Sequence, residues 1–175
     1  MSALRPVSLW TLLVSTIFGA VDLLALSRSL FSKIPGVNDV LNEPGVYLVL
    51  RRDAGPPEFL SEGTGGRSKG KDPNVEVGCL RTKWVEGAIV LYIGMAGGPC
   101  AKATLRSRLQ AYLRFGEGKN SGHSGGRRIW QLCDSGDLLV CWKPTGKAVP
   151  REVEKQMIAE FEQRYGKLPF ANERH

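Results

Sequence analysis

The chain has 175 residues, 42% of them hydrophobic and 23% charged, which is typical of one soluble globular domain with its own core. Its four cysteines form no C-x-x-C pair and it has only two histidines, which excludes a zinc-finger type of metal site. The net charge of +7 favours an anionic partner, of which nucleic acid is the most common. We expect the thiols to be reduced and packed as small apolar groups, as in a cytoplasmic protein.

The first predicted element is a helix over residues 8–31. Its apolar residues recur at helical spacing: Leu12, Leu13, Ile17, Val21 and Leu24. A signal peptide or a membrane span fits this segment less well, because Asp22 interrupts the apolar run, the run is too short to cross a bilayer, and no clear cleavage signal follows. We therefore predict an N-terminal helical extension over residues 1–44 that packs on the domain, with no membrane association.

Two strands and a long connection follow. Residues 45–51 predict a buried strand, and residues 88–93 predict a second one. Between them, residues 53–74 are rich in Gly, Pro and Lys, which indicates a long loop. Residues 75–80 predict a further short strand.

The second half of the chain alternates helices and strands. Apolar spacing predicts a helix over 104–115, and a short element starts at "RIWQL" after a basic, glycine-rich loop. Residues 138–142 predict a strand, and the last helix is expected over 150–165, with Pro150 in its first turn and Gly166 as its stop. This order predicts an α/β (α+β) fold with a small mixed or antiparallel central sheet of about three to five strands, flanked by helices.

The last predicted helix carries a carboxylate on its apolar side. Glu154 falls within the arc formed by the apolar residues Val153, Met157, Ile158, Phe161 and Tyr165. A lone carboxylate on such a stripe is costly unless it is paired or binds a metal. Two interpretations follow: a buried ion pair with a nearby arginine, or a metal-binding or catalytic group.

Other chemically useful residues lie beside glycines and on the earlier helix. Tyr47 and Tyr92 each lie near a strand end next to a glycine, where another group can approach the backbone closely. Arg108 and Tyr112 are one helical turn apart. The planar fork of an arginine suits phosphoryl oxygens. The simpler alternative is that Arg108 extends along the surface and Tyr112 only packs.

Taken in order along the chain, these residues resemble the GIY-YIG endonuclease family, and in particular its small stand-alone bacterial members. The resemblance spans residues 45–172, and although each short motif is weak alone, their order is specific. The matching positions are GVY at 45–47, YIG at 92–94, Arg108, Tyr112, EKQMI at 154–158 and PFAN at 169–172.

This resemblance implies a GIY-YIG-like fold over residues 45–175 and a metal-dependent endonuclease that hydrolyses DNA phosphodiester bonds, in repair, restriction or mobile-element processing. It implies that Glu154 binds one divalent cation. Mg²⁺, or Mn²⁺ in its place, is expected because a hard carboxylate site that retains waters suits Mg²⁺.

The resemblance also assigns roles to the other site residues. Tyr47 would act as general base or as a relay toward the attacking water, which requires a lowered pKa of its phenol. Tyr92 would orient that water or the phosphate, and Arg108 would bind the scissile phosphate. Tyr112 would contact a phosphate or support Arg108, and Asn172 would brace the Glu154 end of the site.

The spacing of the two tyrosines departs from the family pattern. Tyr92 follows Tyr47 by 45 positions, where the family usually has a short hairpin, so residues 53–88 are interpreted as an insertion. Its glycines and prolines predict a mobile flap outside the core, and Arg67, Lys69 and Lys71 give it charge for contacting DNA.

A wider set of residues is predicted to contact nucleic acid without reading sequence: Lys69, Lys71, Lys119, His123, Arg127 and Arg128. For His123 the alternative is a solvated loop histidine that does not take part. Trp130 and Trp142 are expected in the core.

Two other classes of function compete with the nuclease. A nucleic-acid-binding module that has lost catalysis predicts the same basic loops, but gives no reason for a carboxylate on the apolar arc of the last helix. An interaction protein that docks through its N-terminal helix leaves the two tyrosine motifs unexplained. The sequence therefore favours the endonuclease, with its DNA substrate and its oligomeric state left open.

Overall fold

The protein is described from a computed structural model, which covers residues 32–33, 40–52, 54–67, 70–98, 102–121, 123 and 126–173. The helix expected over residues 8–31, and most of the extension expected over 1–44, lie outside the described residues. The same holds for Lys69. Within the described ranges, no helix is long and apolar enough to cross a membrane.

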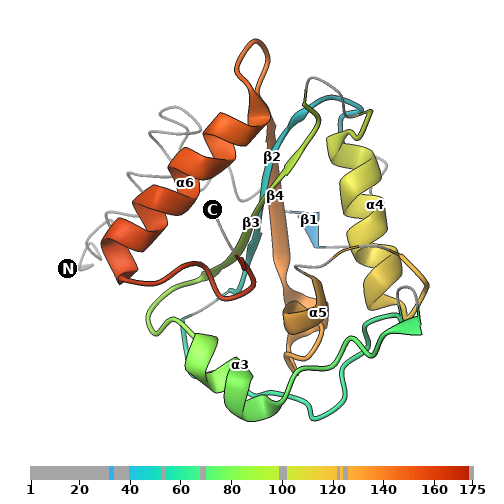
Figure 1. Ribbon diagram of the computed structural model, residues 1–175, viewed down its shortest axis with the longest axis vertical. Helices are drawn as coiled ribbons and strands as arrows, with labels where there is room; N and C mark the ends of the chain where they lie inside the picture. The colour runs from blue at the N-terminus through green and yellow to red at the C-terminus, as the bar shows by residue number, and fades with distance from the viewer. Residues whose placement is uncertain are drawn as a thin grey trace, which may run out of the picture.

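The core of the fold is an antiparallel sheet of four strands in the order β1-β4-β2-β3 (Figure 1). The strands are β1 (Ser32–Lys33), β2 (Gly45–Leu50), β3 (Val90–Ala96) and β4 (Leu139–Pro144). Every residue of the central strand β2 is buried, in keeping with its run of branched and aromatic side chains between two neighbouring strands. The predicted α+β class with a small antiparallel sheet is thus confirmed.

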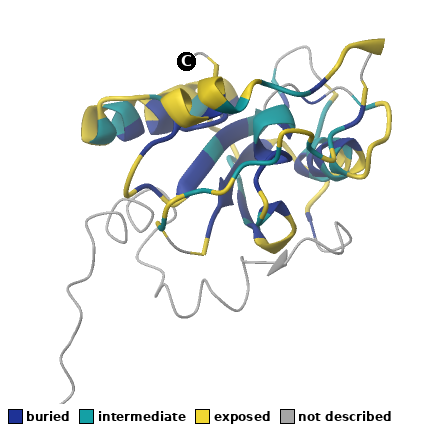
Figure 2. Ribbon diagram, turned by 90° about the horizontal axis from the view of Figure 1, so that it is seen from below, coloured by how far each residue is buried: buried dark blue, intermediate teal, exposed yellow. Residues whose placement is uncertain are grey.

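Helices cover both faces of the sheet, with α6 on one side and α4 on the other (Figure 1). The helices described are α3 (Val77–Lys83), α4 (Leu105–Gly116), α5 (Gly126–Ile129) and α6 (Pro150–Tyr165). Alternate residues of β2 serve the two faces: Tyr47 and Val49 pack in the α4 core, whereas Val46 and Leu48 pack with α6. Figure 2 shows the buried strands beneath helices that each keep an exposed side.

Local sequence signals set the ends of the two long helices. The Thr104 side chain caps α4 in a capping box with Ser107. Pro150 opens α6, and Gly166 ends it in the left-handed conformation, with φ of 68°. Both helices match the predicted ranges within one or two residues.

The strand predicted over 75–80 is wrong, because this segment begins helix α3. Leu80 and Trp84 are both buried and lie one helical turn apart, so a helix directs the two side chains into the same core. The Thr82 hydroxyl also donates to the carbonyl of Gly78, as the helical spacing allows.

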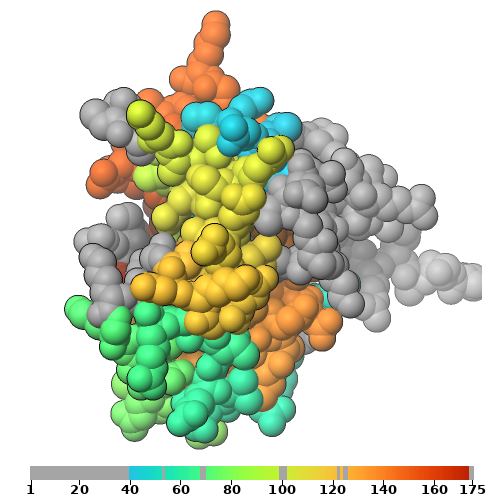
Figure 3. All heavy atoms as spheres, turned by 90° about the vertical axis from the view of Figure 1, so that its right-hand side faces the viewer, coloured from blue at the N-terminus to red at the C-terminus, as the bar shows by residue number. Residues whose placement is uncertain are grey.

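The expectation that residues 53–88 lie outside the core as a mobile flap is also wrong for the described part. Phe59 stacks on Phe170 and meets the edge of Trp84. The buried Gln131 side chain bonds the backbone of Leu60 and Val75, which fixes both arms of the segment. In Figure 3 this segment, in green, forms the face below α4, in yellow. Arg67 and Lys71 are exposed on this segment, whose packed residues are interspersed with exposed ones of both charge signs.

Candidate active site

The two tyrosines of the short motifs meet on neighbouring strands. Tyr47 on β2 lies opposite Gly94 on β3, and the ring centroids of Tyr47 and Tyr92 are 5.9 Å apart. A Cβ atom at Gly94 would lie 2.6 Å from the rings of both tyrosines. Glycine is therefore required here because the two phenols close over the strand.

A histidine from a distant loop binds the hydroxyl of Tyr47. His123 Nε2 lies 3.0 Å from the Tyr47 oxygen, and the backbone N–H of Gly126 donates to His123 Nδ1 at 3.1 Å. Because a backbone N–H can only donate, Nδ1 must be unprotonated, so a neutral His123 carries its proton on Nε2 and donates it to Tyr47. The alternative of a solvated loop histidine is wrong, since His123 is only 2% exposed, and the same burial gives no support to the predicted contact of His123 with nucleic acid.

Burial controls the ionisation of these groups. Burial, helped by the positive charge of Arg108, lowers the pKa of His123 to about 3, so the ring is neutral at physiological pH. Burial also raises the pKa of Tyr47 well above its usual value, and the neighbouring Tyr92 adds to this. The pKa of Tyr92 is raised too, first by burial and then by the charge of Glu154. The resemblance requires a lowered pKa for the Tyr47 phenol. In the protein without cation or substrate, this pKa is raised instead.

Glu154 and Arg108 bring opposite charges to the same place from α6 and α4. Burial raises the pKa of the half-buried Glu154, while Arg108, Arg151 and the backbone of Met95 oppose this shift. Both charges act on Tyr92. No ion pair joins Glu154 to a basic side chain among the described residues, so the structural alternative of a buried ion pair does not account for this carboxylate.

A single carboxylate is compatible with one type of cation site. The described residues contain no group of three or more His, Cys, Asp or Glu side chains able to enclose a metal. Mg²⁺, however, is usually held by one or two carboxylates together with waters and substrate phosphates. A partly desolvated Glu154 that has no ion-pair partner within the described ranges fits that arrangement, in which the substrate completes the site.

Tyr112 lies in the core next to this site. It is fully buried, and its ring centroid is 5.2 Å from that of His123 and 5.0 Å from that of Trp130. Within the described part of the chain, its hydroxyl has no hydrogen-bond partner. This position favours packing beside His123 over direct contact with a phosphate. Trp130 and Trp142 lie in the core, as expected.

Asn172 fixes the edge of the sheet rather than the Glu154 end of the site. Its side-chain amide donates to the carbonyl of Ile93 at 2.9 Å and accepts from the N–H of Ile93 at 3.0 Å. The N–H of Ala171 donates to the carbonyl of Leu91. The tail after α6 thus pairs with β3 on both sides of Tyr92 and holds that strand in place.

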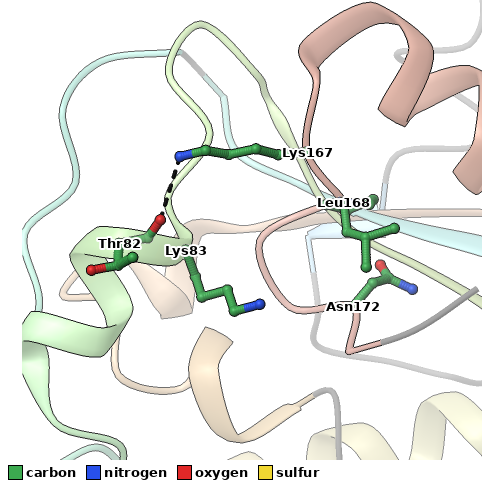
Figure 4. Close-up of a pocket in the computed structure, with 6 residues that line it drawn as sticks. Thr82, Lys83, Lys167, Leu168 and Asn172 are labelled. Carbon is green, nitrogen blue, oxygen red and sulfur yellow. Dashed lines mark hydrogen bonds between the residues drawn. The ribbon is translucent and has the colours of Figure 1, made fainter.

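A pocket lies beside this tail, between it and the end of α3 (Figure 4). Lys83 and Asn172 line it, while the Lys167 ammonium reaches across to the carbonyls of Thr82 and Trp84. These contacts anchor the start of the tail to the end of α3. Because Asn172 lies in the same tail, the anchor helps to hold it against β3.

The predicted basic residues that the structure describes lie on several different elements. Lys119 pairs with Glu117 on the exposed end of α4, and Lys71 is exposed on the segment before α3. Arg127 and Arg128 lie on α5 and both contact Glu173. Of the predicted set, His123 contacts both tyrosines, and Arg127 and Arg128 follow it in the chain on α5. No local signal in the glycine-rich loop distinguished His123 from a solvated residue.

Comparison of the chain with protein-family models, with curated proteins and with solved structures finds no match.

Proposed function

We propose that the protein is a metal-dependent endonuclease of the GIY-YIG type that hydrolyses DNA phosphodiester bonds. The observation that carries the proposal is the convergence of Tyr47, Tyr92, Arg108 and Glu154, which come from four different elements and act on one another electrostatically. A half-buried carboxylate that has no ion-pair partner among the described residues, placed near an arginine and two phenols, is an expensive arrangement for stability alone. In phosphodiester hydrolysis, each of these four side chains would have a role.

The cation and Arg108 would stabilise the negative charge of the phosphate and of the transition state. Mg²⁺ or Mn²⁺ held by Glu154 and the substrate phosphate would supply positive charge for the negative charge that develops in the transition state. The Arg108 guanidinium would bind the scissile phosphate through two parallel N–H donors. The raised pKa of Glu154, caused first by its burial, would fall when a cation binds it.

The phenols would order the attacking water through a hydrogen-bond chain with a fixed direction. His123 donates from Nε2 to Tyr47, so the Tyr47 proton is free to point toward Tyr92. Tyr47 is fully buried whereas Tyr92 is partly exposed, so Tyr92 is the phenol that would meet the water or the phosphate. To act as the base, Tyr47 would first lose its proton to solvent once the cation and Arg108 lower its pKa. The Nε2–H of His123 would stabilise this phenolate, which would then take the proton of the attacking water through the Tyr92 hydroxyl. His123 is a positioning residue in this scheme, because its Nε2 already carries a proton and cannot take another.

The test is cleavage of a panel of linear, nicked and branched DNAs, with Mg²⁺ or with EDTA. Glu154→Gln should abolish cleavage while folding and DNA binding stay nearly unchanged, because the amide keeps the shape but loses the charge that holds the cation. Glu152→Gln, an exposed change on the same helix, is the matched control and should cleave like the wild type. Wild-type levels of cleavage by Glu154→Gln, or no cleavage of any DNA by the wild type with Mg²⁺, would refute the proposal.

A nucleic-acid-binding module without catalysis is the second candidate. The raised pKa values of Tyr47 and Tyr92, caused first by burial, favour it, because neither phenol is ionised in the protein alone. It leaves unexplained why the half-buried Glu154 has no ion-pair partner among the described residues. DNA binding by the wild type without cleavage of any member of the panel would select this candidate.

A further inference from the structure

Arg127 and Arg128, the arginine pair, both contact one carboxylate oxygen. Arg127 reaches Glu173 Oε1 at 3.1 Å, and Arg128 reaches the same oxygen at 3.6 Å. Arg128 also donates to the backbone carbonyl of Asn172 at 3.5 Å. The side chain of Arg128 is only 11% exposed, whereas that of Glu173 is 44% exposed. Arg127 is 42% exposed, so a cationic site with one largely buried and one half-exposed arginine is occupied by a carboxylate that faces solvent.

The arginine pair lies at the edge of the candidate active site. It follows His123 by a few residues on α5, and His123 binds Tyr47. Glu173 follows Asn172, whose amide clamps Ile93 next to Tyr92. After burial and the stronger effect of Glu154, the negative charge of Glu173 also contributes to the raised pKa of Tyr92.

The donors of the arginine pair suit a phosphate better than one carboxylate oxygen. Two guanidinium groups that converge on a single oxygen can bind two oxygens of a phosphate with stronger, charge-assisted bonds. Arg127 keeps a spare donor, because its Nε is buried and has no partner among the described residues. An ion pair with a half-exposed carboxylate adds little stability, so a competing anion can displace it.

We propose that the arginine pair binds a backbone phosphate of DNA adjacent to the scissile phosphate, and that Glu173 occupies this site in the free protein until DNA displaces it. The inference rests on the proposed function, because the scissile phosphate is placed by Arg108 and Glu154. Glu173 then acts as an internal competitor that lowers affinity for DNA. On binding, Glu173 loses its protein partners and takes up a salt cation, which offsets part of the counterion release from DNA.

The experiment measures binding of a fluorescein-labelled DNA duplex by anisotropy, in EDTA, over a series of salt concentrations. Glu173→Gln should tighten binding by about fivefold at low salt, because the competitor has lost its charge. Its slope of log affinity against log salt should be steeper than that of the wild type by up to about one. Glu86→Gln, an exposed residue in the turn before β3, makes the same change in net charge and should tighten binding by less than about twofold.

A second pair of variants shows whether the arginines carry the effect. Adding Arg127→Gln or Arg128→Gln to Glu173→Gln should remove most of the gain in affinity. Arg127 is the more exposed of the two, so its variant tests the site even if replacing Arg128 lowers the midpoint of thermal unfolding. Persistence of the full gain in both double variants would overturn the inference.

The outcomes separate this inference from the proposed function. Equal gains from Glu173→Gln and Glu86→Gln, with the wild type binding and cleaving DNA, would refute the competitor role alone. No DNA binding by the wild type or by Glu173→Gln would refute both. The affinities of all variants are compared in EDTA, so loss of catalysis cannot imitate a change in binding.

Discussion

The buried neutral state of His123 predicts a specific dependence of stability on pH. The pKa of His123 is about 3 in the folded protein, because burial and then the charge of Arg108 disfavour the imidazolium, against about 6.5 in an unfolded chain. The unfolded state therefore binds more protons between these two values, and the free energy of unfolding falls as the pH falls through this window. The contribution is fully present above pH 6.5 and amounts to about 5 kcal/mol when lost completely.

Urea unfolding of the wild type and of His123→Gln, measured from pH 7 to pH 4, isolates this contribution. The glutamine can still donate a hydrogen bond to Tyr47, but it has no group that ionises in this range. The wild type should lose about 3 kcal/mol more than the variant between pH 7 and pH 4. His175, the only other histidine, is present in both proteins, so it cancels from the difference.

The comparison must be made between the two pH profiles, because carboxylates titrate in both proteins. Parallel profiles, differing by less than about 1 kcal/mol over the whole range, would refute the buried neutral histidine. A long-range ¹H–¹⁵N NMR spectrum of the wild type gives an independent readout. It should show a protonated Nε2 and an unprotonated Nδ1 for His123, and the opposite tautomer would refute the direction of the hydrogen-bond chain through Tyr47.

Two further predictions concern stability. Asn172→Asp keeps an acceptor for the N–H of Ile93 but turns a carboxylate oxygen toward its carbonyl, so it should lower the free energy of unfolding by about 2–4 kcal/mol at pH 7, as measured by urea unfolding. The exposed Asn120→Asp should cost little, and equal losses in the two variants would contradict the clamp. Tyr112→Phe removes a buried hydroxyl that has no partner among the described residues, so stability should stay within about 1 kcal/mol of the wild type or rise. A loss of more than about 2 kcal/mol in the same measurement would show that this hydroxyl is satisfied.

The elements of this fold could be predicted where a local pattern decides them. Helical spacing of apolar residues, Pro150 and Gly166 set the last helix, and runs of branched residues set β2 and β3. The segment over 75–80 is predicted wrongly as a strand, because its short apolar stretch carries no clear period. Its helical state depends on the core that Leu80 and Trp84 enter.

Residue types and periodicity identify which side chains can make up a site, namely the two tyrosines beside glycines, Arg108 and the carboxylate on the apolar arc of α6. The packing of distant segments sets the contact of His123 with Tyr47, which is 76 positions away, and the clamping of β3 by Asn172 from 79 positions away. It also decides that Glu173 occupies the arginine pair. The physical reason is that periodicity reports which face of an element is buried, whereas a contact between distant segments depends on how the elements pack. The pKa values followed the packing as well, because burial is the largest cause of the shift for His123 and for both tyrosines.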